Sequence, residues 1–217
     1  MDNITSAAQP VLRSRVYDSF NALRIRANEV IGVDFLGDIS DALWTLEHRR
    51  QVGEPVRNWH YTGRAFSINR NQVGFPPPFE VVREDTDLAT YWRIYVRGAQ
   101  EAQNGSLGEP LRRVPWDFAA ATQGDVDAYN QGGRLRGQMP SGYYVDFTQL
   151  ALDYGWTRDA STTDWRNNFN GRSYWVFQKR EGLLWYEAMR ELYAESQLGG
   201  FVPTPTPAPI PTLTQQP

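Results

Sequence analysis

His60 and Ser67 are the residues of this 217-residue chain with the clearest capacity for chemistry. His60 is one of two histidines, and Ser67 follows it by seven positions. An imidazole can accept a hydroxyl proton, so a serine–histidine–aspartate arrangement is possible in principle, although the sequence shows no evident third partner. The chain has no cysteine, which excludes disulfides, thiol nucleophiles and thiolate metal sites. Any metal would have to use histidine and carboxylate ligands.

The residues after His60 predict a turn that leads into a short strand. Gly63 suits the turn, and residues 65–68 alternate so that Phe66 and Ile68 share one face. A strand of this kind would present a side chain at the edge of a sheet.

Segment 58–68 resembles the first zinc-binding motif of D-alanyl-D-alanine carboxypeptidases and related hedgehog-type peptidases, Ser-x-His-x-x-Gly-x-Ala-x-Asp. His60, Gly63 and Ala65 match this motif. Asn58 stands at the position of the serine, and Ser67 stands at the position of the zinc-binding aspartate.

More than a hundred residues later, segment 173–176 resembles the second motif of the same family, Glu-x-Trp-His. In that family the glutamate is the general base and the histidine completes the zinc ligands. Trp175 matches, whereas Ser173 stands at the position of the base and Val176 at that of the histidine. The resemblance therefore implies a ligand-deficient member of the family.

Zinc catalysis is not supported by the residues at the matched positions, which supply one imidazole, two hydroxyls and an isopropyl group. A catalytic zinc needs about three protein ligands, an open position for water and a base. We therefore predict no catalytic residue, no zinc and no other cofactor, with His60 as the only matched ligand position. An alternative is a zinc site rescued by His48 with Asp34, Asp38 or Asp117, although their spacing does not call for one.

The family resemblance implies that a relict groove remains and binds cell-wall peptide, glycan or another extracellular ligand. His60 and Arg64 would bind a carboxylate of the ligand, and aromatic side chains would form the walls. The predicted ligand-binding residues are Trp59, His60, Tyr61, Arg64, Ser67, Ser173 and Trp175. The opposite interpretation is that His60 and Trp175 are packed beneath a closed groove.

Two further functions stay open at this point. One is an active zinc-dependent D-alanyl-D-alanine carboxypeptidase with atypical ligands. The other is an architectural domain that spaces or docks the neighbouring domains of a larger exported protein.

The pattern of apolar residues predicts an α+β domain over residues 1–200, with a small, mainly antiparallel sheet and helices packed on one side. The family resemblance implies that this domain has the hedgehog and D-alanyl-D-alanine peptidase fold. Residues 123–141 are expected to form a long irregular insertion because they are rich in glycine and polar residues. Helices are predicted over residues 11–31, 39–50 and 181–194, and strands over residues 79–83, 91–97 and 172–178. On the second helix, His48 is expected to be a solvated surface residue.

Composition limits the possible partners and the compartment. The formal charge of −3 is spread along the chain, so nucleic acid binding is not expected. The sequence contains no apolar run long enough to predict a membrane-spanning helix. No signal peptide is visible near Met1. Residues 201–217 are rich in proline and threonine and predict an extended linker or tail. Such linkers are typical of exported proteins, so we expect an extracellular or cell-surface location and other domains of a larger chain as neighbours.

Overall fold

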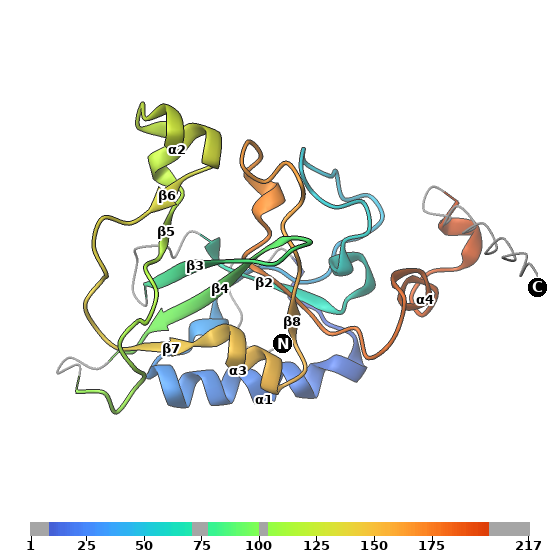
Figure 1. Cartoon of the computed structure of the whole chain (residues 1–217). Coiled ribbons are helices and arrows are strands. Elements are labelled where there is room, and N and C mark those ends of the chain that lie inside the picture. Colours follow the sequence, from blue (N-terminus) through green and yellow to red (C-terminus); the bar gives the residue numbers. More distant parts are fainter. Residues whose placement is uncertain (1–8, 71–77, 100–103, 200–217) are drawn as a thin grey trace, which may run out of the picture.

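The computed structural model describes residues 9–70, 78–99 and 104–199 (Figure 1). Within these ranges the chain forms an α+β structure with four α-helices and small antiparallel sheets, which confirms the predicted class. The single sheet expected from the sequence is divided into three, with four, three and two strands. The predicted tail at residues 201–217 lies outside the described residues.

The four-stranded sheet joins the two halves of the chain. Its strands lie in the order β1 (Ile39–Asp41), β2 (Ala65–Ile68), β9 (Val176–Gln178) and β8 (Thr157–Arg158). All four residues of β2 are buried, because neighbouring strands lie on both sides of it and the core covers its apolar face. Ser67 lies opposite Val176 on one side and Asp41 on the other. β2 is therefore the strand on which the rest of this sheet is arranged.

The other sheets carry the longest strands. The three-stranded sheet contains β3 (Phe79–Asp85), β4 (Thr90–Arg97) and β7 (Tyr144–Asp146), and the two-stranded sheet contains β5 (Trp116–Asp117) and β6 (Arg134–Leu135). Trp92, Ile94 and Val96 of β4 are buried, and the residues between them are half-buried. This alternation is the one that the sequence predicts, and both long strands are confirmed.

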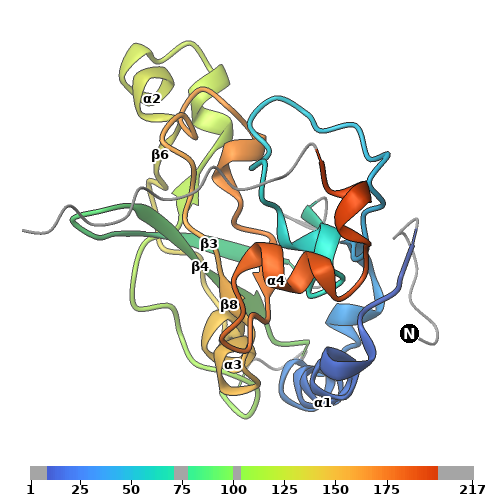
Figure 2. The same ribbon diagram turned by 90° about the vertical axis from the view of Figure 1, so that its right-hand side faces the viewer.

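Helix α1 (Ser14–Ile31) confirms the first predicted helix. It buries an apolar stripe of Val16, Phe20, Leu23, Ala27 and Ile31, and it ends at Gly32, whose φ of 90° is accessible to glycine at little cost. Helix α3 (Phe147–Asp153) lies beside α1 on the same side of the β3–β4 hairpin (Figures 1 and 2). No helix in the described part of the chain has the length and apolar character needed to cross a membrane.

The two remaining helices lie away from this layer (Figure 2). Helix α2 (Val126–Gln131) forms within the insertion that the sequence predicts to be irregular, because the Asp125 side chain accepts hydrogen bonds from two backbone N–H groups of its first turn. Helix α4 (Trp185–Arg190) is shorter than the predicted helix over residues 181–194.

The predicted helix over residues 39–50 is wrong. Ile39 is fully buried and pairs with Ile68 as part of β1, and residues 42–58 form a loop. Intrinsic helix propensity is a weak preference, and here pairing with β2 outweighs it. The strand predicted over residues 172–178 begins only at Val176, because Ser173 adopts a left-handed φ of 52° that a strand cannot contain.

Arg64 connects the strand β2 region to the C-terminal part of the chain. Its side chain is 1% exposed, and its guanidinium donates hydrogen bonds to Glu181 at 2.8 Å and to Glu191 at 2.9 Å. A buried cation of this kind is tolerated only when carboxylates pair with it. The two glutamates therefore hold the end of the chain against the segment that contains His60.

We expect Glu191→Gln to lower the free energy of unfolding by about 1–3 kcal/mol, because it leaves the buried Arg64 with one carboxylate partner. Arg64 holds the pKa of Glu191 below its ordinary value, so the contribution of the wild-type pair should be lost as the pH falls through that lowered pKa. Urea denaturation at several pH values measures both effects.

Glu29→Gln is the matched control, since Glu29 forms an exposed ion pair with Arg26 on α1. Its effect should stay below about 1 kcal/mol. Equal destabilisation by the two substitutions would contradict the role assigned to Arg64.

Candidate functional site

A polar pocket lies where β1, β2 and β9 meet the loop of residues 42–58. Its volume is about 160 Å³. Residues from four separate parts of the chain line it, among them Asp41, Trp44, His60, Ser67, Ser173 and Trp175. We call it the His60 pocket. The pairing of β2 with β9 accounts for this convergence, because it sets Ser67 beside Val176 at the floor of the pocket.

Ser67, His60 and Asn58 form a buried chain of hydrogen bonds. The Asn58 side-chain oxygen accepts a hydrogen bond from the His60 backbone N–H at 3.0 Å and lies 2.6 Å from His60 Nδ1. Because that oxygen is an acceptor, Nδ1 carries the imidazole proton. Nε2 is then free to accept, and the Ser67 hydroxyl donates to it at 3.0 Å.

The imidazole of His60 is neutral near pH 7. Burial lowers its pKa to about 4, and the charge of Asp41 opposes this shift while His48 adds to it. A neutral imidazole whose other nitrogen is held by an amide is oriented as a proton acceptor toward Ser67.

An aromatic stack closes one side of the His60 pocket. The centre of the Trp44 ring lies 4.7 Å from that of the His60 ring, with an angle of 20° between the two ring planes. The corresponding values for Trp44 and His48 are 3.8 Å and 10°. His48 also contacts Glu54 at 3.3 Å and lines the pocket, with 26% of its side chain exposed. The expectation that His48 is a solvated residue on a helix is therefore wrong, because residues 42–58 fold as a loop over the pocket.

Four of the seven predicted ligand-binding residues line the His60 pocket, namely His60, Ser67, Ser173 and Trp175. Trp59, Tyr61 and Arg64 do not. Trp59 and Tyr61 pack in a second apolar cluster with Trp185 of α4, and Arg64 is paired with its two glutamates.

Asn58 is the functional residue that the sequence did not single out as a partner of His60. Its oxygen caps the short helix η2 (Trp59–Thr62), and asparagine is a favoured residue at such positions. An asparagine two residues before a histidine at a predicted turn was the available signal. Recognition of Asn58 as the third partner also required the distance to Nδ1, which the sequence does not contain.

The carboxylates considered for a rescued zinc site lie elsewhere. Asp34 pairs with Arg24 at 2.8 Å, and Asp38 accepts a hydrogen bond from Asn69 at 2.7 Å. Asp117 accepts the Ala119 backbone N–H at 2.9 Å, and none of the three aspartates lines the His60 pocket. Across residues 9–70, 78–99 and 104–199, no three histidine, aspartate or glutamate side chains are grouped closely enough to hold a metal ion.

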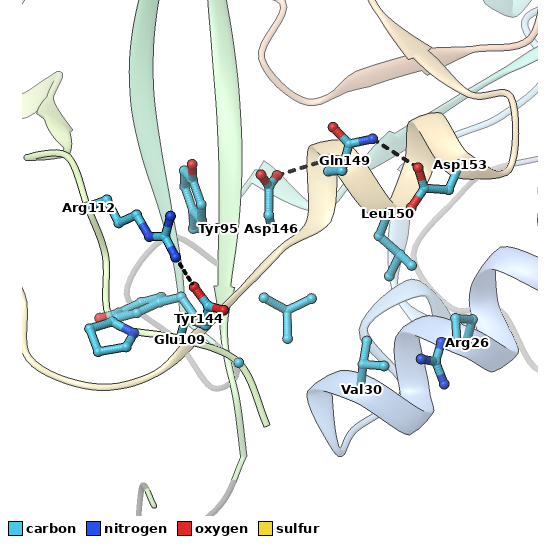
Figure 3. A pocket seen from close by; sticks show the side chains of 13 residues that line it. Arg26, Val30, Tyr95, Glu109, Arg112, Tyr144, Asp146, Gln149, Leu150 and Asp153 are labelled. Atoms are coloured by element: carbon cyan, nitrogen blue, oxygen red, sulfur yellow. Dashed lines mark hydrogen bonds and ion pairs between the residues drawn. The ribbon is translucent and has the colours of Figure 1, made fainter. Parts of the chain in front are cut away.

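A larger cavity of about 520 Å³ lies between α1, α3 and the end of β4 (Figure 3). Its polar side chains largely bind one another. Arg112 donates to Glu109 at 2.7 Å, and the amide of Gln149 donates to Asp153 at 2.9 Å. The smaller His60 pocket is the better candidate site because it contains a buried hydroxyl bonded to an imidazole nitrogen, an arrangement that can do chemistry.

The sequence matches no protein-family model, and neither a curated protein nor a solved structure matches the chain. The functional proposal therefore depends on the side chains of the pocket themselves.

The buried imidazole predicts a pH dependence of stability. His60 has a lower pKa in the folded chain than the ordinary value of 6.5, so the unfolded chain binds more protons between these two values and stability falls as the pH falls. Between pH 7 and pH 5 this effect amounts to about 2 kcal/mol. His60→Gln should remove that part of the pH dependence in urea denaturation, whereas Ser67→Ala should keep it. An unchanged slope in His60→Gln would show that His60 titrates normally.

Proposed function

We propose that this chain is a catalytically degenerate relative of the zinc D-alanyl-D-alanine peptidases, with their hedgehog-type fold, and that its His60 pocket binds a polar extracellular ligand such as cell-wall peptide or glycan. The observation that carries the proposal is the β2–β9 pairing. It brings together the two segments that resemble the family motifs, with Ser67 opposite Val176.

The lining of the pocket supports binding of a polar ligand. Trp44, stacked on His60 and His48, and Trp175, stacked on Phe169, form rigid aromatic walls of the pocket. Gln51, Asn170 and Ser173 line the same space and are bonded to one another, with the Asn170 amide donating to Gln51 at 3.2 Å and the Ser173 hydroxyl donating to the Asn170 carbonyl at 3.4 Å. A ligand would use the hydrogen-bonding capacity that remains on these groups. A hydroxyl at position 67 and an isopropyl group at position 176 leave binding as the better supported activity.

Titration calorimetry with muropeptides and with chitooligosaccharides tests the proposal. We expect one of the two ligand classes to bind, and we expect Ser67→Val to weaken binding about tenfold or more because it removes a polar group from the floor of the pocket and leaves His60 Nε2 without its donor. Ser196→Val, in the exposed short helix η6 (Glu195–Gln197), is the matched control and should bind as the wild type does.

Two outcomes would overturn the proposal. The absence of heat with every ligand would favour an architectural spacer. Zinc bound in a one-to-one ratio, measured by mass spectrometry after exposure to zinc, would favour an active zinc carboxypeptidase with atypical ligands.

A second candidate function is acyl transfer through Ser67, which the Ser67–His60–Asn58 chain favours. The Ser67 oxygen would attack an acyl carbon while its proton passes to His60 Nε2. The leaving group would then take that proton from His60, and water would hydrolyse the acyl-serine with His60 as the base. Two distances support this candidate: Ser67 Oγ lies 3.0 Å from His60 Nε2, and the Asn58 side-chain oxygen lies 2.6 Å from His60 Nδ1.

Labelling with a fluorophosphonate tests this candidate, because the serine oxygen displaces fluoride and the proton leaves with it. We expect one adduct by intact mass on the wild type, none on Ser67→Ala, and labelling slowed about a hundredfold or more in His60→Gln. Ser196→Ala should label as the wild type does. An adduct that persists in Ser67→Ala, or no adduct on the wild type, would exclude Ser67 as the nucleophile.

A further inference from the structure

The turn that leads into β9 has an unusual backbone conformation. Arg172 is the last residue of the short helix η5 (Asn170–Arg172), and Ser173 follows it in the left-handed region, with a φ of 52° and a ψ of 13°. In the part of the chain that the structure describes, Ser173 is one of two non-glycine residues with a positive φ. This conformation is unfavourable for a residue with a Cβ atom, and strain of this kind is concentrated at functional sites.

A right-handed residue followed by a left-handed one turns successive backbone N–H groups toward the same point. Such an arrangement, called a nest, is an anion-binding concavity. Here the helical Arg172 and the left-handed Ser173 form the nest, to which Ser173 and Tyr174 contribute N–H groups. The N–H of Arg172 is used within η5, where it donates to the Phe169 carbonyl at 3.2 Å.

The N–H groups of Ser173 and Tyr174 have no acceptor within the described ranges 9–70, 78–99 and 104–199. Both residues are nevertheless buried, with 4% and 5% of their surface exposed. Buried backbone N–H groups are almost always paired in proteins, because an unpaired one costs free energy. The nest therefore has the capacity to bind an acceptor that the described chain does not provide.

The nest lies at the wall of the His60 pocket, because Ser173 lines that pocket together with Ser67 and His60. The pairing of Ser67 with Val176 brings β2 close to this turn. The volume of the pocket is only about 160 Å³, so groups on its different walls can contact the same small acyl group.

The carboxylates that line the pocket have other donors. Asp41 accepts a hydrogen bond from Trp44 Nε1 at 3.1 Å, and Glu54 accepts one from the Gln51 backbone N–H at 2.8 Å. Neither carboxylate accepts a hydrogen bond from the nest, whose N–H groups therefore stay available to an oxygen atom of a ligand.

We propose that the N–H groups of Ser173 and Tyr174 form an oxyanion hole for acyl transfer through Ser67. This inference rests on the second candidate function, in which Ser67 is the nucleophile. As the Ser67 oxygen bonds to the acyl carbon, the π electrons of the carbonyl move to its oxygen and the serine proton passes to His60 Nε2. The nest stabilises the resulting oxyanion with two hydrogen bonds. The carbonyl then re-forms, the bond to the leaving group breaks, and the leaving group takes the proton from His60.

Two substitutions at Ser173 separate the backbone from the side chain. Ser173→Gly removes the hydroxyl and keeps the left-handed conformation, which glycine adopts at little cost. Ser173→Thr keeps a hydroxyl but disfavours that conformation, because threonine is β-branched. The readout is the rate of labelling by a fluorophosphonate, whose phosphoryl oxygen gains negative charge as the Ser67 oxygen bonds to phosphorus.

We expect Ser173→Gly to label at close to the wild-type rate and Ser173→Thr to label about tenfold more slowly or worse. Calorimetry should show a higher Tm for Ser173→Gly and a lower one for Ser173→Thr. The opposite order of labelling rates would assign the effect to the hydroxyl and overturn the oxyanion hole. Equal rates in the two variants would also overturn it.

Removal of a single N–H group is a second test that leaves every side chain in place. Incorporation of the hydroxy-acid analogue of tyrosine at Tyr174 changes its backbone N–H to an ester oxygen. We expect labelling to slow by about a hundredfold, as is usual for the loss of one oxyanion-hole donor.

The same replacement at Tyr186 is the matched control and should label as the wild type does. Tyr186 lies in the first turn of α4, where an N–H group has no intrahelical acceptor to lose, and it does not line the His60 pocket. An unchanged rate in the Tyr174 ester, with a labelled wild type, would overturn the oxyanion hole and leave Ser67 as the nucleophile. The absence of an adduct on the wild type would overturn both the oxyanion hole and the candidate function.

Discussion

The pairing of β2 with β9 is the constraint on which the site depends. It joins two segments more than a hundred residues apart, and its hydrogen bonds extend beyond the strands, from Lys179 N to Arg64 O at 2.9 Å and from Ile68 N to Trp175 O at 3.0 Å. A slip of one residue would turn every side chain of β2 to the opposite face. Ser67 would then leave the pocket and Phe66 would leave the core. The register thus fixes the core and the chemistry together.

The local structure around His60 gives a second link between folding and chemistry. The oxygen of Asn58 caps the short helix η2, and the same atom orients the imidazole. Asn58 is therefore both the cap of η2 and the residue that sets the tautomer of His60. Asp41 is close enough to favour the protonated imidazole, but burial outweighs its charge. The site consequently holds a neutral proton acceptor beside a hydroxyl.

Regular periodicity was the part of the fold that the sequence could predict. The three- and four-residue spacing of α1 and the alternation of β4 each depend on one buried face, and both are confirmed. Residues 65–68 form the predicted strand, but both of its faces are buried. Residues 39–50 were predicted as a helix, because their apolar spacing resembles one and the competing pairing of Ile39 with Ile68 is long-range. Four predicted site residues line the pocket: Ser67 lies in β2, His60 in the short helix η2, and Ser173 and Trp175 just before β9.

The residues that the sequence misassigned or missed are those whose role depends on distant partners. Arg64 was assigned to the ligand, yet Glu181 and Glu191 lie more than a hundred positions away and bind it. Arg70 and Arg172 could not be distinguished from Arg64, because the local sequence does not show which arginine a carboxylate from a distant part of the chain will contact.

Arg64 and Arg172 differ in whether the fold supplies a carboxylate for the guanidinium that it removes from water. Both environments remove water from a guanidinium, and the free-energy cost is of the same kind in each. At Arg64 the fold offsets that cost internally with two carboxylates, so the side chain is fixed and has little left to offer a ligand. At Arg172 the guanidinium instead lies 4.3 Å from the centre of the Phe118 ring and 5.2 Å from that of the Phe169 ring, and no carboxylate among the described residues forms an ion pair with it. The His60 pocket itself holds a neutral imidazole and the guanidinium of Arg70 beside the carboxylates of Asp41 and Glu54, so groups of both signs face the same space.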